Sequence, residues 1–358
     1  MREPVRPHTD RRSALGEQQM KAARFLGDGE LAVVGLPDPT PGPREVLLAP
    51  AAVGVCGTDT HILDGHYPAR PPVTLGHEVA GRVVALGDGA RGLQVGDLVT
   101  VEPHRYCGVC QYCRRGMEHM CVAKEAYGVH LDGGMAELMV VPDRIAYRLP
   151  DGVDATIGAL TEPLSCCVHA MDRLGLMSGL PILIQGCGPA GALLVALARS
   201  LGSHPVVVSD MRPDRRDLGM RMGADIALDP SDPDFERQAL ALTGGDGFPY
   251  VVDAVGLPAV LESAIRLAAR GARLLVFGVA DPQARASVSP NEIYTKELTL
   301  LGTAINPFSH LRAVGLLTRL PLHELRVAAY PLGKAVDAIA AARTGASDKI
   351  QIVPGLNA

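Results

Sequence analysis

The sequence contains no tryptophan and only five phenylalanines, so it offers no large aromatic platform for stacking a substrate. It also lacks any apolar run approaching the ~20 residues that a helix needs to cross a bilayer, and we therefore expect no membrane span. A large excess of positive charge is absent too. The formal net charge is −5, and an acidic surface does not attract nucleic acids or acidic membranes. These absences argue against a nucleic-acid-binding or membrane protein and favour a soluble one.

The first nineteen residues, MREPVRPHTDRRSALGEQQ, are poor in apolar side chains and rich in arginine. They contain no apolar stretch that could form the core of a secretory signal. A segment that buries so little apolar surface cannot offset the entropy of becoming ordered. We therefore expect a disordered tail over residues 1–19 and folded structure from Met20 onward.

The remaining chain changes in pattern after Pro181, and the length of the chain suits two domains of ~150 residues each. Short β-rich runs broken by glycine and proline occupy residues 20–150, and they include residues 45–55, 78–86 and 97–103. Runs of this kind favour a compact antiparallel or barrel-like domain.

Strands and helices alternate after Pro181. The expected strands are residues 181–185, 205–210, 225–229, 250–255, 273–278 and 297–302, and helical patterns occupy 190–201 and 259–270. Such alternation predicts a doubly wound parallel sheet. Another helix and a short strand, residues 349–353, follow residue 303.

A glycine-rich turn lies directly between the first of these strands and its helix. It reads Gly186-Cys-Gly188-Pro-Ala-Gly191 and matches the G-x-G-x-x-G pattern of dinucleotide-binding proteins. Glycines there allow a tight turn and a close approach of the backbone to a pyrophosphate, which the N-terminus of the following helix attracts. The predicted cofactor-binding residues are Gly186, Gly188, Pro189, Ala190, Gly191, Asp210 and Arg215.

Asp210 ends the next strand, 19 residues beyond Gly191. This spacing is close to the ~20 residues expected for the acidic group that binds the ribose diol. A carboxylate there would repel a 2′-phosphate, so the pattern favours NAD over NADP. The nearby Arg212, Arg215 and Arg216 weaken that argument, because they could attract the phosphate.

Four cysteines lie within fifteen residues, with the spacing Cys107-x2-Cys110-x2-Cys113-x7-Cys121. In a chain without secretory features, such density indicates metal binding rather than disulfides, and the expected compartment is the cytoplasm. Four thiolates match a closed structural zinc site. Ferredoxin motifs begin in the same way but continue as x3-C-P, whereas here Val122 follows the fourth cysteine.

Two further segments, CGTDTH from Cys56 and GHE ending at Glu78, carry candidate ligands for a second metal. A catalytic zinc takes about three protein ligands and leaves one position for water or substrate. Cys56 offers a thiolate and His77 an imidazole.

Together with the glycine-rich turn, these motifs make the sequence resemble the zinc-containing medium-chain alcohol dehydrogenases from about residue 20 to the end. The matching segments are CGTDTH, GHEVAGRVVALG, the four-cysteine lobe and GCGPAG with its downstream aspartate. The similarity is greatest to the branch that contains polyol (sorbitol, butanediol) and threonine dehydrogenases. It implies an α/β fold, in which a GroES-like β-rich catalytic domain is joined to a Rossmann domain.

The resemblance also implies roles for individual residues. Cys56 and His77 would bind the catalytic zinc, and Glu162 in TEPLSCCVH takes the third position, where simple alcohol dehydrogenases have a cysteine. Glu78 is also a metal ligand in this family. The resemblance leaves open whether Glu78 or Glu162 binds the zinc directly. Thr58 and His61 match the proton relay, Glu162 also counts among the catalytic residues, and Asp59 would orient a ligand. Cys166 and Cys167 are expected to be packing residues at the start of a helix.

The expected organisation is a tail over 1–19, a catalytic domain over 20–170 with its zinc lobe at about 104–122, an NAD-binding domain over 171–303, and a return to the catalytic domain over 304–358. The expected reaction transfers a hydride from a secondary alcohol (a polyol, sugar-like or amino alcohol) to NAD and gives a ketone. A pathway-specific dehydrogenase of a cyclic or terpene-type alcohol stays open, as does a non-catalytic zinc scaffold with this fold.

Two zinc ions and NAD are the expected cofactors, and a small-molecule alcohol is the expected partner, with no nucleic acid or membrane. The strand at residues 297–302 would leave an exposed sheet edge, which predicts a homodimer or homotetramer. Residues proposed to shape specificity are His66, Tyr67, Tyr127, Ile305 and Phe308, and the loop 305–310 is expected near the nicotinamide.

Overall fold

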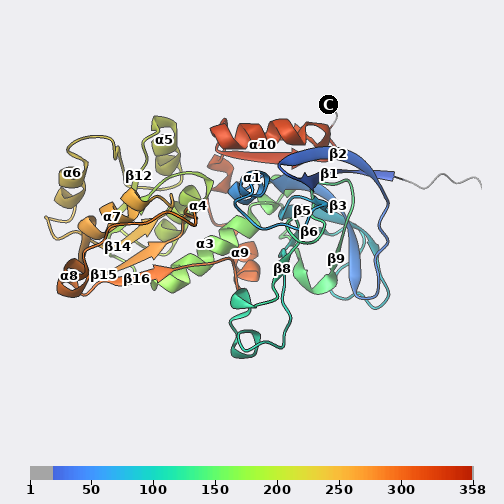
Figure 1. The fold of residues 1–358 in the computed structure, drawn as a ribbon, viewed down its shortest axis with the longest axis horizontal. Coiled ribbons are helices and arrows are strands. Elements are labelled where there is room, and N and C mark those ends of the chain that lie inside the picture. The colour runs from blue at the N-terminus through green and yellow to red at the C-terminus, as the bar shows by residue number, and fades with distance from the viewer. Residues whose placement is uncertain (1–18, 357–358) are drawn as a thin grey trace, which may run out of the picture.

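A six-stranded parallel sheet organises one of two lobes in the computed structural model, which describes residues 19–356 (Figure 1). Its strands, in spatial order, are β13 Ile226–Leu228, β12 Val206–Ser209, β11 Ile182–Gln185, β14 Phe248–Asp253, β15 Ala268–Val276 and β16 Thr299–Gly302. This is the 3-2-1-4-5-6 order of the doubly wound nucleotide-binding fold, so the predicted parallel sheet is confirmed. The order reverses between β11 and β14, and a crevice at this point is where such sheets bind ligands.

Five helices connect these strands: α4 Pro189–Ser200, α5 Pro213–Arg221, α6 Phe235–Ala241, α7 Pro258–Leu267 and α8 Pro290–Lys296. Four of them begin with proline, whose fixed φ suits the first helical position and whose missing N–H leaves no bond unmade there. Helix α4 is buried along residues 191–198 because it packs between β11 and α3 Thr161–Leu174.

The second lobe is β-rich, as predicted. A seven-stranded sheet has the order β10-β6-β5-β3-β18-β17, with β9 also paired to β3, and a smaller sheet has the order β2-β1-β4. The strands are β1 Gln19–Gly27, β2 Glu30–Pro37, β3 Glu45–Gly54, β4 Val73–Thr74, β5 Glu78–Leu86, β6 Leu98–Val101, β9 Met139–Pro142, β10 Ala146–Arg148, β17 Val327–Pro331 and β18 Lys349–Val353. Their pairings are antiparallel apart from β17 with β18.

The remaining helices lie between or beside the two sheets. They are α1 Gly57–Leu63, α2 Ala155–Gly158, α9 His310–Leu316 and α10 Ala335–Thr344, and short 3-10 turns occupy Cys113–Arg115, Glu118–Met120, Asp143–Ile145, Leu322–Glu324 and Leu332–Lys334. Figure 1 shows α3 crossing from one lobe to the other. It also shows the cysteine-rich segment projecting below the β-rich lobe, past the short pair β7 His104–Arg105 and β8 Glu125–Ala126.

The C-terminal segment returns to the β-rich lobe. Strand β18 pairs antiparallel with β3, with Gln351 opposite Gly54, and α10 packs against β18 and α1. The chain therefore places its last strand beside the segment that carries Cys56.

The tail predicted over residues 1–19 lies outside the described residues except for Gln19, which already belongs to β1. Among residues 19–356, no helix is long and apolar enough to cross a membrane.

Candidate metal and dinucleotide site

The structure brings Cys56, His77 and Glu78 together, with one ligand atom of each within 4.8 Å of the others. Cys56 follows β3 and precedes α1, whereas Glu78 is the first residue of β5 and pairs in register with Gly54 of β3. The pairing of β3 with β5 therefore sets the distance between the thiol and the other two groups.

Two glycines make this arrangement possible. A Cβ on Gly54 would lie 1.8 Å from Oε2 of Glu78, so any larger residue would displace the carboxylate. Gly76 has φ +94, a left-handed conformation that glycine tolerates best, and a Cβ there would lie 2.7 Å from side-chain atoms of Met135 and Val53. Both positions are close approaches that require glycine.

The Glu78 carboxylate is paired with a buried lysine. The Nζ atom of Lys349 in β18 lies 2.5 Å from Oε2 of Glu78 and donates to the carbonyl oxygen of Val55 at 3.1 Å. The two side chains are only 5% and 1% exposed. Burial disfavours the ammonium, but Glu78 and Cys56 outweigh it and raise the pKa of Lys349.

Asp59 lies where it can orient both neighbouring groups. Its Oδ2 accepts the backbone N–H of Cys56 at 2.9 Å, and its Oδ1 lies 3.7 Å from Nδ1 of His77. The side chain is fully buried, and burial raises its pKa although His77 opposes that shift. A carboxylate on Nδ1 leaves Nε2 of a histidine available to a metal.

Glu162 lies in the first turn of α3 and faces the same site, but it is not among the three residues grouped within 4.8 Å. Burial raises its pKa to about 7, with His77 opposing and Glu78 adding to the shift. The thiol of Cys166, one helical turn later, donates to Oε1 of Glu162 at 3.4 Å. Cys167 is fully buried, as expected of a packing residue, whereas Cys166 contacts the candidate site.

The residues of this cluster fit a divalent cation. Three buried carboxylates (Asp59, Glu78 and Glu162) and the Cys56 thiol face one buried ammonium. The buried Oδ1 of Asp59 and Nδ1 of His77 have no hydrogen-bond partner in the described part of the chain, but they face each other at 3.7 Å, so the chemistry of the donor set itself carries the fit. Buried anionic groups are tolerated when a counter-charge lies beside them, and thiolate, imidazole and carboxylate are zinc ligands.

Thr58 and His61 lie on one side of α1, three residues apart. The hydroxyl oxygen of Thr58 is 3.7 Å from the sulfur of Cys56, and both side chains are half-buried. The ring of His66 is 6.4 Å from that of His61. Burial raises the pKa of Tyr67, and the charges of Cys56 and Glu162 add to this shift.

The glycine-rich turn faces a cavity of about 300 Å³ between the lobes. A Cβ on Gly191 would lie 2.1 Å from the carbonyl oxygen of Gly186, so this glycine permits tight packing of the turn. A Cβ on Gly188 would meet nothing within 4 Å, because this residue borders the cavity. Pro189 begins α4 there, and Cys56 and Lys349 contribute to the opposite wall.

Asp210 follows β12 and is hydrogen-bonded to the same turn. Its Oδ2 accepts the backbone N–H of Cys187, and its Oδ1 accepts that of Arg212, both at 2.9 Å. Arg215 lies 3.7 Å from the carboxylate and lines the cavity. The structure thus brings together the predicted cofactor-binding residues.

Cys107, Cys110, Cys113 and Cys121 form a second group, again within 4.8 Å of one another. Backbone N–H groups of Cys110 and Ala123 donate to the sulfurs of Cys107 and Cys121 at 3.3 and 3.4 Å. The backbone N–H of Cys113 lowers the pKa of Cys110 to about 6. All eight cysteines lie in the described part of the chain and are free of disulfides, so this lobe presents four thiols to one point.

The residues proposed to shape specificity differ in their positions. Tyr127 packs in the hydrophobic core of the β-rich lobe, and its contact with a substrate stays a prediction. Ile305 and Phe308 have φ +49 and +54. Asn306 between them is fully buried and donates to Oγ of Ser165 at 2.6 Å, which fixes this loop to the helix that carries Glu162.

Sequence reasoning missed Lys349, Gly54 and Asn306. A lysine at the start of the apolar strand KIQIV was a usable signal, since a lysine is almost never fully buried unless it is paired. Gly54 ends an apolar strand two residues before Cys56. Its lack of a Cβ is required only because Glu78 lies across the sheet, which the local sequence does not indicate.

Comparisons with known proteins agree with this geometry. The chain matches the models of two families, "Alcohol dehydrogenase GroES-like domain" over residues 42–151 and "Zinc-binding dehydrogenase" over 189–317. L-threonine 3-dehydrogenase of Pyrococcus horikoshii is 37% identical over 74% of this chain and 76% of the relative. Sorbitol dehydrogenase of Halalkalibacterium halodurans is 34% identical over 77% and 81%. A crystal structure described as a zinc-binding dehydrogenase from Sinorhizobium meliloti bound to NADP has a TM-score of 0.89 and 34% identity, and the match covers 94% of this chain and all of that one.

Proposed function

The chain belongs to the family of zinc-containing medium-chain alcohol dehydrogenases, and from this premise we propose that it oxidises a secondary alcohol to a ketone with NAD at the site around Cys56. One observation carries the proposal. The thiol of Cys56, the imidazole of His77 and the carboxylate of Glu78 converge beside the cavity that the glycine-rich turn borders. A metal held there would lie next to a bound dinucleotide.

The proposed ligands are Cys56 and His77, with Glu78 and Glu162 as the carboxylates that complete the set. The position of Glu78 supports a direct role as a ligand, because a carboxylate oxygen lies within 4.8 Å of the ligand atoms of Cys56 and His77. The same carboxylate also forms an ion pair with Lys349. Glu162 lies in the first turn of α3, where the thiol of Cys166 donates to its Oε1 at 3.4 Å, and we propose it as the second carboxylate. A zinc ion bound by these groups acts as a Lewis acid that makes an alcohol hydroxyl more acidic.

The chain's own residues would bind the substrates and move the proton. The backbone of Gly188 and the N-terminus of α4 would hold the cofactor's pyrophosphate, and Asp210 would accept the hydroxyls of its ribose. Thr58 would receive the proton from the substrate hydroxyl and pass it to His61, which is half-buried and so connects the site to solvent. Histidine suits this step because its ordinary pKa lies near neutral pH.

We propose NAD rather than NADP as the preferred cofactor. Asp210 is only 8% exposed, and its carboxylate is fixed by two backbone N–H groups, so it cannot turn away from a 2′-phosphate without leaving them. Such a phosphate would add about two negative charges next to it.

The proposed substrate class is a polyol, sugar-like or amino alcohol. Relatives of the chain are named for threonine, sorbitol and, in Uromyces fabae, D-arabinitol, each of which carries a secondary hydroxyl next to other polar groups. Polar side chains near the site, the buried Glu162 and Asn306 and the half-buried Tyr67, suit such neighbours better than an apolar alcohol.

We further propose a cytoplasmic homodimer or homotetramer. Strand β16 is at the edge of the six-stranded sheet, and Leu300 on it is 40% exposed. An unpaired strand edge can be covered by a second copy of the same strand. Sedimentation would give the number of subunits.

A screen of NAD reduction tests the proposed function. It would use purified protein of known zinc content with polyols, amino alcohols and cyclic alcohols, and NADP in parallel with NAD. We expect NADH formation with polyols or amino alcohols and two zinc ions per chain. Turnover confined to cyclic alcohols would favour the pathway-specific alternative, and an absence of turnover with every alcohol would contradict the proposal.

A further inference from the structure

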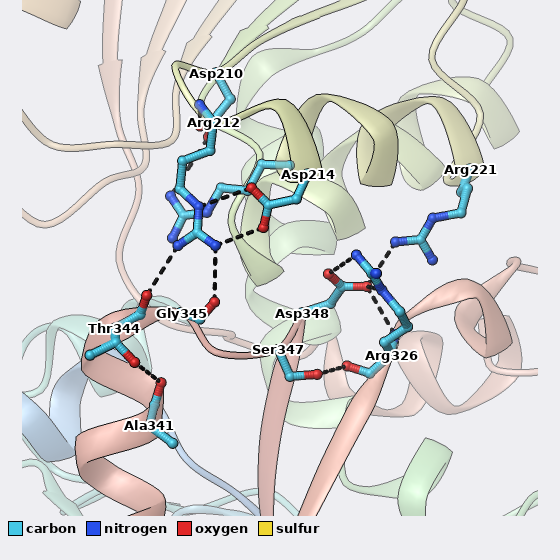
Figure 2. Close-up of polar contacts among 11 residues, drawn as sticks. Asp210, Arg212, Asp214, Arg221, Arg326, Ala341, Thr344, Gly345, Ser347 and Asp348 are labelled. Atoms are coloured by element: carbon cyan, nitrogen blue, oxygen red, sulfur yellow. Dashed lines mark hydrogen bonds and ion pairs between the residues drawn. The ribbon is translucent and has the colours of Figure 1, made fainter.

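Arg212 extends from the cofactor lobe to the other lobe (Figure 2). Its backbone N–H binds Asp210, but its side chain points away from that carboxylate. Its Nη1 donates to the carbonyl oxygen of Thr344 at 3.1 Å, and Nη2 donates to that of Gly345 at 3.0 Å. These carbonyls are at the end of α10, so the contact joins the two lobes beside the cavity.

Asp214 holds the same guanidinium from its own lobe. Nε of Arg212 lies 3.1 Å from Oδ1 and Nη2 lies 2.6 Å from Oδ2 of Asp214, a bidentate pair. Together with the two carbonyls, the pair engages four of the five N–H groups of Arg212. The guanidinium is thereby occupied on both sides.

The end of α10 is suited to this contact. The last carbonyl groups of a helix lack partners within the helix and carry partial negative charge. Gly345 ends α10 with φ +64, and a Cβ there would lie 2.5 Å from Nη1 of Arg212. A glycine at this position both ends the helix and leaves room for the arginine.

The two other arginines near Asp210 differ in how they are engaged. Arg216 donates to the carbonyl oxygens of Asp210 and Met211 and pairs with Asp229 at 2.9 Å. Arg215 lies 3.7 Å from the Asp210 carboxylate, with a third of its side chain exposed. Arg212, two residues after Asp210, is the cation whose release would place a new positive charge near the ribose.

We propose that Arg212 determines cofactor specificity by being held away from the ribose, so that the choice between NAD and NADP depends on Asp214 and the end of α10 as well as on Asp210. The proposal rests on the proposed function. A 2′-phosphate needs arginine donors, and the arginine next to the ribose carboxylate is bound to the opposite lobe. Freeing it while neutralising Asp210 would create a site for that phosphate.

Binding of two small nucleotides tests this proposal without turnover. Adenosine 2′,5′-bisphosphate carries the 2′-phosphate, and adenosine 5′-monophosphate lacks it. Calorimetry would measure both in Asp210→Asn protein, and then with Asp214→Asn added. Because a hydrogen bond to a charged group contributes about 1.5–3 kcal/mol, we expect the bisphosphate to bind about tenfold tighter or more after the second change, with the monophosphate unchanged.

Two further variants assign the effect to Arg212. Adding Arg212→Ala to the double variant should abolish the gain. Asp234→Asn is a matched control, because Asp234 pairs with Arg237 on α6 at 3.2 and 2.6 Å, nearly the same geometry as Asp214 with Arg212. It should leave the affinity for the bisphosphate unchanged.

Three results would overturn the proposal. Asp214→Asn would not raise the affinity for the bisphosphate, or the higher affinity would persist after Arg212→Ala is added. The third is a lower affinity when Arg212→Ala is made in Asp210→Asn protein with Asp214 intact. Asp348→Asn removes a different contact between the lobes, the 2.8 Å pair with Arg221 (Figure 2). An equal gain in that variant would assign the effect to looser lobes and would also overturn it. Failure of the alcohol screen leaves these binding results intact, so the two proposals can fail separately.

Discussion

Replacing Lys349 by methionine removes the ammonium that faces the Glu78 carboxylate while keeping a side chain of similar length. The carboxylate would then be left 1% exposed without its partner at 2.5 Å. Breaking a buried ion pair by removing one member costs about 3–5 kcal/mol. That is a large part of the about 5–15 kcal/mol by which a folded domain is stable, so Lys349→Met should lower the free energy of unfolding clearly.

The loss should depend on the metal and on the second charge. Chelator-treated protein should show the whole loss, whereas zinc-loaded protein should show less, because a cation near Glu78 replaces the missing charge. Adding Glu78→Gln removes the unpaired carboxylate and should restore more than half of the loss.

Urea unfolding followed by circular dichroism measures these differences, a suitable method for a chain without tryptophan. Arg237→Met serves as a control, since it breaks an ion pair whose side chains are 72% and 58% exposed, and should change nothing measurable. The reasoning is refuted if Lys349→Met costs less than about 1 kcal/mol in chelator-treated protein, far below the loss expected for a buried pair. It is also refuted if the double variant is as unstable as the single one.

Three other predictions concern the two metal sites and a buried histidine. Cys56→Ser or His77→Ala should abolish alcohol oxidation and remove one zinc per chain, while calorimetry should still detect NAD binding, because the glycine-rich turn is untouched. Cys110→Ser should remove the other zinc and lower the melting temperature, as expected for a structural site. Burial lowers the pKa of His310 to about 3, below the ordinary 6.5. Its neutral form therefore stabilises the fold above pH 6.5, and this stabilisation is lost as the pH falls. Between pH 7.5 and 5.0 wild type should lose about 2 kcal/mol more than His310→Leu in urea unfolding.

Each of these predictions has a result that contradicts it. Activity retained by Cys56→Ser or His77→Ala would exclude the proposed metal ligands. A Cys110→Ser protein that keeps two zinc ions would contradict the prediction that the four cysteines bind zinc. For His310, the control is His323→Gln, whose side chain is 77% exposed. If wild type and His310→Leu lose stability equally below pH 6.5, the buried ring is not the cause.

Local patterns predicted most of the fold because each strand carries its own signal. Residues 45–55, 78–86 and 349–353 were expected to be strands and form β3, β5 and β18 within one residue. The alternation after Pro181 predicted the parallel sheet for the same reason. Gln19, which was expected to belong to the tail, pairs with Pro37 and so belongs to β1.

The parts of the site that were missed depend on pairings between distant segments. Lys349 and Glu78 are 271 positions apart, and no local pattern indicates that one neutralises the other. Cys166 was expected to be a packing residue. Its contact with Glu162 became visible only in the structure, where the two residues lie one turn apart on α3. The sequence does not show whether Arg212 faces the ribose site. In the structure its guanidinium donates to carbonyl oxygens at the end of α10 instead.

Strand β3 explains why these distant residues meet. Gly54 at its end lies opposite Glu78 of β5 on one side and opposite Gln351 of β18 on the other. Cys56 follows two residues later, so the register of two strand pairings places the thiol, the carboxylate and Lys349 at one point. A slip of one residue in either pairing would turn Glu78 or Lys349 to the opposite face of the sheet. The proposed metal ligands Cys56, His77 and Glu78 therefore depend for their charge balance on strand β18, which must pair with β3 before the site is complete.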